Sequence, residues 1–227
     1  MPTRLTASSP HSQPLREAPK FKRWEKLLRE NGLTLHGFEE LFVKRNGNGQ
    51  VLFALLNVDA TTPEGNKLLP LCFLKGEVVS VLVCLIDEET SEKFLLLVKQ
   101  RRVSTGGYVY EHPAGMVDAD DAPLAVAVRE VREETGVEVK PSEVHLLNEQ
   151  PYFPSTGTSD EALHFYYTEF TLSRTAIDAL NDQHTGEAGE HEFIQTCVVP
   201  FAEGKRLIAN ACGLLNIYLY EDATRRA

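Results

Sequence analysis

Positive charge is scarce in this sequence, and the shortage limits the partners it can bind. Lysine and arginine number 23 against 33 aspartates and glutamates, which gives a formal net charge of −10 over 227 residues. A protein that grips nucleic acid over a broad surface neutralises phosphates with many lysines and arginines. We therefore expect no nucleic-acid partner, and any phosphate-bearing ligand has to meet a local cluster of positive charge.

The chain also lacks a long hydrophobic run and paired cysteines. Its longest apolar stretch, from Val78 to Ile86, is interrupted by Ser80, whereas a membrane-spanning helix needs about 20 apolar residues. The four cysteines are scattered, with no Cys-x-x-Cys pair and no histidine at metal-ligand spacing. We expect no membrane partner, reduced thiols and a cytoplasmic location.

Acidic residues are absent from the first sixteen positions, which carry Arg4, Arg16, three serines and two threonines. This composition is typical of a disordered tail and also of the remnant of an organelle-targeting segment. We expect a disordered tail over residues 1–20, with organelle targeting as the alternative.

A small N-terminal unit is expected over residues 21–70. Apolar residues from Phe21 to Asn31 form one helical stripe that ends at a glycine. Two strand patterns, Leu33–Lys44 and Val51–Val58, flank the hairpin signal Asn46–Gly49. Its larger aromatic residues are assigned to the core, with an interface or base-stacking role as the alternatives: Trp24, Phe38 and Phe42.

Residues 71–227 mix strand and helix signals, which favours an α/β or α+β sandwich. A helix is expected over Ala122–Thr135, capped by Asp120 or Asp121 and ended by Gly136. The other expected elements are strands over Val78–Ile86, Phe94–Gln100, Tyr108–His112, Val144–Tyr152, Ala162–Leu172 and Phe193–Val199, and a closing helix over Cys212–Arg225.

Three carboxylates crowd one arc of the helix over Ala122–Thr135. Glu130, Glu133 and Glu134 stand at positions i, i+3 and i+4, where like charges repel. Hard divalent cations such as Mg²⁺ take oxygen ligands and leave room for phosphates, so the cluster suits a phosphate enzyme. Arg129, four residues before Glu133, can orient it by an ion pair. The alternative is a solvated charged face.

The sequence around these acids resembles the Nudix box. From Gly115 to Val137 it reads G-x5-D-x7-R-E-V-R-E-E-T-G-V, and the family pattern is G-x5-E-x7-R-E-U-x-E-E-x-G-U, where U is bulky and apolar. Asp121 is the one departure, because the family has glutamate there.

The resemblance implies the Nudix α/β/α sandwich and a bound Mg²⁺, for which Mn²⁺ can substitute. It implies that the metal ligands are Glu130, Glu133, Glu134 and the backbone carbonyl of Ala114. Such ions polarise a diphosphate and lower the pKa of a bound water. Glu133 and Arg129 are accordingly candidate catalytic residues.

A second resemblance lies downstream, in the acidic loop from Pro154 to Glu161. It resembles the Pro-Ser-x-Gly loop of ADP-ribose and ADP-sugar diphosphatases, in which Ser155 would bind substrate. Relatives use an acid of this loop to activate the attacking water, and Glu161 is our first choice, ahead of Asp160 or Glu192. The alternative is an acidic surface turn.

Two further segments resemble these diphosphatases. Gln100-Arg101-Arg102, followed by Glu111-His112-Pro113-Ala114-Gly115, is similar to the family's Q-x-R and E-x-P-A-G. Arg102 and Glu111 would bind substrate, and Arg102 has a donor fork that suits a diphosphate. Arg101 is a substrate candidate or a surface charge. Glu190 or Glu192 lies in a stretch that resembles plant-type ADP-sugar diphosphatases and could supply another acid near the metal.

The sequence therefore predicts a Mg²⁺-dependent hydrolase of the diphosphate bond in a nucleoside diphosphate sugar, either ADP-ribose or an ADP-hexose. A homodimer formed through the N-terminal unit is also expected from the resemblance. One alternative is another Nudix activity, on nucleoside triphosphates or dinucleoside polyphosphates. The other is a weakly catalytic sensor of nucleotide sugars, which only Asp121 supports.

Overall fold

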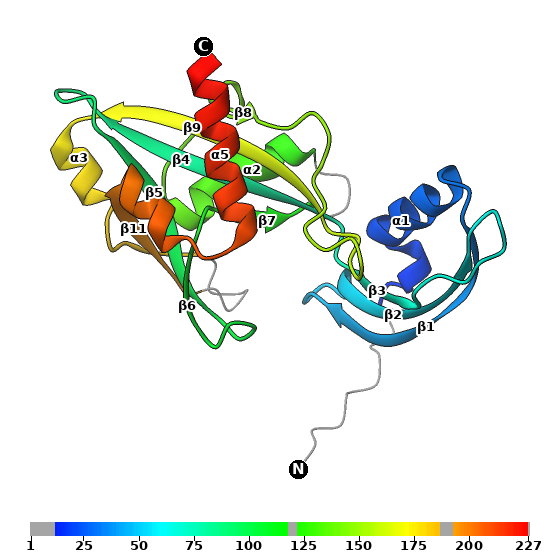
Figure 1. The fold of residues 1–227 in the computed structure, drawn as a ribbon. Coiled ribbons are helices and arrows are strands. Elements are labelled where there is room, and N and C mark those ends of the chain that lie inside the picture. The colour runs from blue at the N-terminus through cyan, green and yellow to red at the C-terminus, as the bar shows by residue number, and fades with distance from the viewer. Residues whose placement is uncertain (1–11, 118–121, 187–192, 227) are drawn as a thin grey trace. The chain divides into compact units, whose positions relative to one another are not determined.

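The computed structural model describes residues 12–117, 122–186 and 193–226, which divide into two compact units (Figure 1). The first unit comprises residues 12–77 together with Ser155–Ala162. The second contains the remaining described residues, from Val78 onward. The loop that carries the expected base, Glu161, therefore belongs with the N-terminal unit.

The first unit is a three-stranded antiparallel sheet, in the order β1-β2-β3, with helix α1 packed on it. Pro19 occupies the first turn of α1, and Gly32, at a φ of 77°, lets the chain turn after it. Phe21 and Trp24 fill the core against Leu56. The elements are α1 (Pro19–Glu30), β1 (Thr34–Arg45), β2 (Val51–Thr61) and β3 (Leu71–Leu74).

Three expectations about this unit need correction. Residues 12–20 do not behave as a tail, because a 3₁₀ turn over Leu15–Glu17 buries Leu15 and Ala18 against the sheet core. The unit extends beyond residue 70, because β3 pairs with β2. Phe42 is 41% exposed and lies beside Phe53, outside the core that holds Trp24 and Phe38. Residues 1–11 lie outside the described part.

The second unit is built on an eight-stranded sheet in the order β10-β11-β5-β4-β9-β8, with β6 paired to β5 and β7 to β4. Its strands are β4 (Glu77–Asp87), β5 (Lys93–Arg102), β6 (Gly107–Glu111), β7 (Ala114–Met116), β8 (His145–Leu146), β9 (Ala162–Leu172), β10 (His184–Thr185) and β11 (Ile194–Pro200). Its helices are α2 (Pro123–Thr135), α3 (Arg174–Ala179), α4 (Phe201–Leu207) and α5 (Ala211–Arg226).

Helices α2 and α5 cover opposite faces of this sheet (Figure 1). Successive residues of a strand point to opposite faces. In β5, Phe94 and Leu96 pack with Val126 and Val131 of α2, whereas Leu95 and Leu97 join the cluster of α5. The expected α+β sandwich is confirmed.

Local details differ from the sequence prediction where side chains replace backbone pairing. Only His145–Leu146 of the strand expected over Val144–Tyr152 forms a ladder. The Asn148 amide bonds the backbone of Leu163 and Phe165 there, which takes the place of a strand ladder.

The predicted cap of the box helix is wrong, because the N-cap is Ala122, which has no side-chain cap hydrogen bond; Asp120 and Asp121 lie outside the described residues. Strands β3, β7 and β10 and helices α3 and α4 were not predicted. No helix within the described ranges is both long enough and apolar enough to cross a membrane.

Candidate active site

The three expected carboxylates lie on α2, whose apolar side is buried in the sheet. Gly136 adopts a φ of 74° and ends the helix. A residue with a side chain adopts this left-handed conformation less easily than glycine does. The carboxylates differ in exposure: the side chains of Glu130 and Glu133 are 13% and 24% exposed, and residue Glu134 is 3% exposed. The arc thus runs from the protein interior to solvent.

Glu130 explains why the box begins with glycine. A Cβ atom placed on Gly115 would lie 2.1 Å from Oε1 of Glu130. The carboxylate therefore occupies the space that any other residue at position 115 would need. This contact packs the start of the box directly on the helix that carries the acids.

Glu134 joins the same two segments by a hydrogen bond. The backbone amide of Ala114 donates to Oε2 of Glu134 at 3.0 Å. The resemblance had assigned Ala114 a role through its carbonyl, and the structure adds a role for its amide. Because Glu134 is buried, this bond to a charged acceptor is a strong local restraint.

Glu133 is held by arginine side chains instead. Nε of Arg129 lies 3.7 Å from one carboxylate oxygen, which is the expected i, i+4 ion pair, and Nη2 of Arg132 lies 3.1 Å from the other. Arg129 also approaches Glu130 at 3.5 Å. These ion pairs are partly exposed and contribute only about 0–1 kcal/mol each, so their partners are exchangeable.

The described residues contain no group of three histidine, cysteine, aspartate or glutamate side chains that already converges to hold a metal. The donor set nevertheless fits a hard divalent cation, since three carboxylates occupy adjacent turns and the space beside Gly115 admits Glu130. Completing the set requires Glu133 to exchange one of its two arginine partners for the ion.

Arg102, Gln100 and Glu111 form a polar cluster on the β5–β6 ribbon. Glu111 Oε2 accepts hydrogen bonds from Nε2 of Gln100 at 3.1 Å and from Nε of Arg102 at 3.1 Å, and Nη2 of Arg102 lies 2.9 Å away. By alternation, Arg102 projects on the same face of the sheet as Leu96 and α2. The arrangement leaves the Arg102 side chain 45% exposed.

Arg101 points to the opposite face of the same ribbon. Its guanidinium carbon lies 4.0 Å from the ring centre of Tyr108, and Lys99 Nζ lies 4.9 Å from that ring. This geometry favours the surface role for Arg101 over the substrate role.

The two loop acids have different partners within the first unit. Oδ1 of Asp160 accepts the backbone amides of Lys75 at 2.7 Å and Gly76 at 3.0 Å, and Arg23 lies 3.4 Å from the other oxygen. Glu161 instead pairs with Nζ of Lys75 at 2.6 Å. Asp160 therefore anchors the loop, whereas Glu161 has one exchangeable side-chain partner.

The remaining expected residues are distributed as follows. Oγ of Ser155 lies 3.1 Å from Oγ1 of Thr158, within the same loop. Asp121, Glu190 and Glu192 lie outside the described residues.

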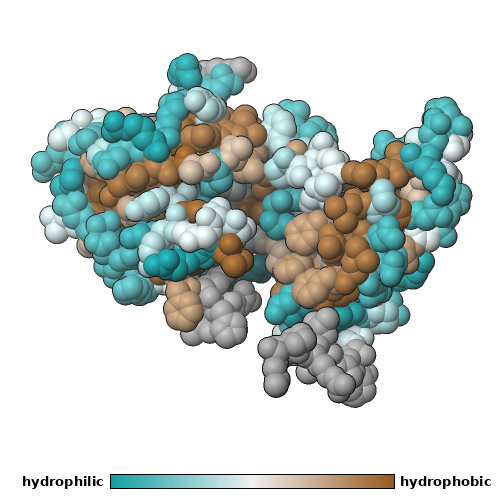
Figure 2. All heavy atoms as spheres, turned by 60° about the horizontal axis from the view of Figure 1, so that its bottom comes forward, coloured by the Kyte–Doolittle hydropathy of each residue, from teal (hydrophilic) through white to brown (hydrophobic). Residues whose placement is uncertain are grey.

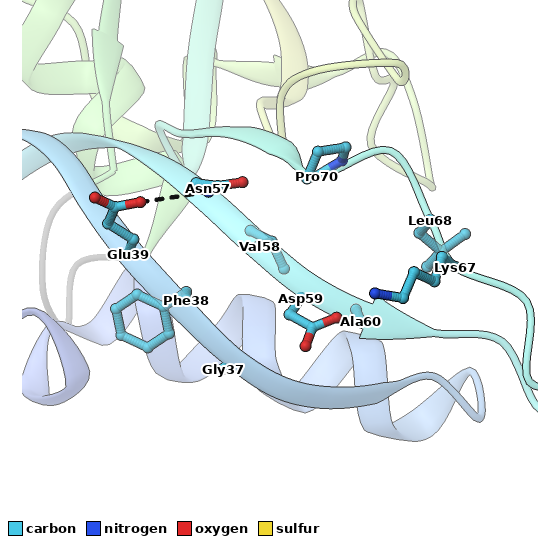
Figure 3. Close-up of a pocket in the computed structure, with 10 residues that line it drawn as sticks. All are labelled: Gly37, Phe38, Glu39, Asn57, Val58, Asp59, Ala60, Lys67, Leu68 and Pro70. Carbon is cyan, nitrogen blue, oxygen red and sulfur yellow. Dashed lines mark hydrogen bonds between the residues drawn. The ribbon is translucent and has the colours of Figure 1, made fainter.

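The first unit also has a cavity of about 550 Å³ between β1, β2 and the segment 67–70 (Figure 3). Asn57 donates a hydrogen bond to Glu39 at its rim, and Lys67 and Asp59 project beside it. None of the expected site residues lines this cavity.

Comparison with known proteins decides the family. The NUDIX domain model matches residues 76–211, which include Gly115, the whole of α2 and the ribbon that carries Arg102. This chain belongs to the Nudix family.

Three curated relatives support the Nudix assignment. Nudix hydrolase 14, chloroplastic, from Arabidopsis thaliana is 34% identical over 195 residues, or 82% of this chain and 61% of the relative. ADP-ribose pyrophosphatase from Bacillus subtilis is 28% identical over 119 residues, 52% of this chain and 58% of its own. ADP-sugar pyrophosphatase from Mus musculus is 29% identical over 125 residues, which are 55% of this chain and 53% of the relative. The chain thus spans between half and about three fifths of these relatives.

A solved structure shares the Nudix fold. A crystal structure described as an ADP compounds hydrolase superposes with a TM-score of 0.58 at 17% identity, covering 85% of this chain and 94% of the other.

Two buried polar residues beside the Nudix box escaped the sequence analysis. His112 is fully buried, and burial lowers its pKa to about 4, so the ring is neutral and its Nε2 donates to the carbonyl of Gly213 at 3.2 Å. Asn216 of α5 donates to the carbonyl of Ser80 at 3.1 Å. Position 112 is variable in the E-x-P-A-G pattern, so no sequence signal singled out His112.

Proposed function

We propose that this chain hydrolyses the diphosphate bond of a nucleoside diphosphate sugar, ADP-ribose or an ADP-hexose, to a nucleoside monophosphate and a sugar phosphate. The observation that carries the proposal is the packing of Glu130 on Gly115 together with the bond from Ala114 to Glu134. The substrate class is supported by the names of the mouse and Bacillus relatives, an ADP-sugar pyrophosphatase and an ADP-ribose pyrophosphatase.

Four charged residues of helix α2 have a part in this proposal. Glu130, Glu133, Glu134 and the carbonyl of Ala114 would hold Mg²⁺, for which Mn²⁺ can substitute. When bound, such an ion polarises the diphosphate and lowers the pKa of a coordinated water. Arg129 orients Glu133 through the ion pair already present.

The substrate-binding part of the proposal rests on Arg102. Glu111 holds the guanidinium at 2.9 Å, and this restrains the long side chain before substrate arrives. Its remaining donors would bind the diphosphate oxygens. Ser155 would contact substrate from the loop.

Glu161 is the proposed base that accepts the proton of the attacking water. Asp160 is the weaker candidate, because one of its oxygens already accepts two backbone amides. In the test, Glu161→Gln should lower kcat by about 10²-fold with little change in melting temperature. Asp160→Ala should mainly lower stability, by about 1–3 kcal/mol. The reverse pattern would exchange the two roles.

The substrate proposal is tested with purified full-length chain and a panel of ADP-ribose, ADP-glucose, UDP-glucose, ATP and diadenosine polyphosphate. The products should be identified by chromatography. A phosphate-release assay coupled to a phosphatase is unsuitable, because the phosphatase itself hydrolyses ATP. We expect kcat/KM to be highest for ADP-ribose or the ADP-hexose, and lost on chelation of the divalent metal. A preference for ATP would contradict the substrate class while leaving the family membership intact.

We also propose that the chain is a homodimer formed through the first unit. Its sheet face away from α1 carries Phe42, Phe53 and Phe73 in a row, with ring centres 6.3 and 5.4 Å apart. Figure 2 shows hydrophobic side chains gathered at the surface of this unit. Light scattering should give twice the chain mass, and Phe42→Ser should shift the protein toward monomer; a wild-type monomer would contradict the proposal.

A further inference from the structure

Neighbouring residues of the Glu111–Gly115 segment point to opposite layers of the sandwich. Glu111 holds Arg102 on the face that α2 covers. His112 turns the other way and is buried, with Nε2 at 3.2 Å from the carbonyl of Gly213 in the first turn of α5. The segment proposed to present both substrate-binding and metal-binding groups is therefore tied to the helix on the far face.

A second buried link runs from α5 to the same segment. Nδ2 of Asn216 donates to the carbonyl of Ser80 at 3.1 Å and lies 3.2 Å from its hydroxyl. Ser80 is the register partner of Ala114 in the β4–β7 pair, and the next amide, Val81, donates to Pro113 at 2.8 Å. Asn216 thus fixes the strand against which Ala114 is held.

The start of α5 is itself fixed in place. Oδ1 of Asn210 accepts the amide of Gly213 at 2.6 Å and so caps the first turn. A Cβ atom on Gly213 would lie 2.7 Å from Cγ2 of Ile208, so glycine permits this close approach. The carbonyl that receives His112 is consequently held by a short capped turn.

Both side chains leave a buried polar atom without a hydrogen bond to the described residues, Nδ1 of His112 and Oδ1 of Asn216. Burying such atoms costs free energy, and apolar side chains of similar volume would avoid this cost. Stability alone does not account for two polar residues here. Their directional bonds, which specify the position of a segment, do account for them.

We propose that His112 and Asn216 are positioning residues through which α5 fixes the Glu111–Gly115 segment for catalysis. This inference rests on the proposed function, because that function has Glu111 hold the substrate-binding Arg102 and assigns Ala114 to the metal. Neither residue touches the reacting atoms. Each acts by holding the backbone of the Glu111–Gly115 segment, which carries Glu111 and Ala114.

The test uses the full-length chain with ADP-ribose and with Mn²⁺ as the binding probe. Mn²⁺ affinity is measured by electron paramagnetic resonance of the free ion, separately from turnover. His112→Met, which keeps volume but removes the donor, should lower kcat and weaken Mn²⁺ binding, each by about 10-fold. His112→Gln retains an N–H donor and should recover most of both.

Tyr220→Phe is the matched control on the same helix. It removes a buried hydroxyl that bonds Glu169 and Lys93, away from the Glu111–Gly115 segment. The control should lower the melting temperature and leave kcat and Mn²⁺ affinity unchanged. Asn216→Ala breaks the second link and should change kcat and affinity in the same direction as His112→Met, which keeps the test decisive if that variant does not fold.

Two results would overturn the inference. One is a His112→Met or Asn216→Ala variant that melts earlier, like Tyr220→Phe, yet keeps wild-type kcat and Mn²⁺ affinity. The other is a His112→Gln variant as impaired as His112→Met. A wild-type chain that does not cleave nucleotide sugars would instead contradict the proposed function, and the Mn²⁺ titration would still decide the positioning role.

Discussion

The two faces of the large sheet carry polar groups of opposite character. On the α2 face, the Arg102 and Glu133 side chains are 45% and 24% exposed and form ion pairs with other side chains of the described residues, whereas Glu134 on the same face is buried and accepts a backbone amide. On the α5 face, His112, Asn216 and Tyr220 are at most 2% exposed. His112 and Asn216 bond to backbone carbonyls, and the Tyr220 hydroxyl bonds the Glu169 and Lys93 side chains.

This contrast separates groups that can bind a ligand from groups that set shape. A partly exposed ion pair costs little to break, so its members can exchange partners for a metal or a phosphate. A buried hydrogen bond is expensive to leave unmade, so its members stay in place. We expect variants of the exposed groups on the α2 face to lose activity at little cost in stability. Variants of the α5 face should lose stability, and activity should fall with them only where the bond to the Glu111–Gly115 segment is broken.

The largest effect on activity is expected for Glu133→Gln. This change removes a proposed metal-binding charge, and kcat should fall by about 10²- to 10³-fold because the metal supplies several kcal/mol of charge stabilisation. The melting temperature should hold or rise slightly, since a repulsive charge is lost. Steady-state kinetics with calorimetry checks both. Glu138→Gln, exposed just after the helix, is the matched control; equal activity of the two variants would remove Glu133 from the site.

The next effect compares two adjacent arginines on opposite faces. Arg102→Ala should lower kcat/KM for ADP-ribose by about 10²-fold, if its charged contact is worth roughly 2 to 3 kcal/mol. Arg101→Ala removes only the stacking on Tyr108, worth about 0.5–1 kcal/mol of stability, and should leave kcat/KM unchanged. Equal losses in the two variants would contradict the division between faces.

A smaller loss of activity is expected for Gly115→Ala. The new methyl would displace the flexible end of Glu130, so kcat should fall by about 10-fold while the fold persists. Gly136→Ala is the control, because its φ of 74° costs about 1 kcal/mol of stability without moving a carboxylate. A Gly115→Ala variant with full activity would show that Glu130 does not need its observed position.

The smallest effect on activity is expected for Tyr220→Phe on the α5 face. Its hydroxyl donates to Glu169 and accepts from Lys93 at 2.6 Å, so its loss should cost about 1–2 kcal/mol of unfolding free energy. Denaturant titration measures this cost, and kcat at 25 °C should not change. A fall in kcat would show that the effect of the α5 face on activity extends beyond the residues that bond the Glu111–Gly115 segment.

Local patterns made much of the site predictable from sequence. The spacing of Glu130, Glu133 and Glu134 required a helix, Gly136 marked its end, and the i, i+4 relation gave the pair between Arg129 and Glu133. The alternation in strand β5 distinguishes Arg101 from Arg102 once the buried face is known.

Long-range contacts had no such signal. Asp160 bonds the amide of Lys75, 85 residues earlier, and no local pattern states that pairing. His112 meets Gly213 across 101 residues, and its role depends on the sheet being sandwiched between two helices. The strand expected near Asn148 failed because a side-chain amide took over the backbone partners.

The burial of Trp24 in the core of the first unit has a spectroscopic consequence. It is the single tryptophan of the chain. The second unit contains all seven tyrosines: Tyr108, Tyr110, Tyr152, Tyr166, Tyr167, Tyr218 and Tyr220. Tryptophan emission therefore reports unfolding of the first unit, and tyrosine absorbance reports the second. Coincident melting curves from the two chromophores would mean that the units unfold as one cooperative body, and separated curves would give the stability of each without cutting the chain.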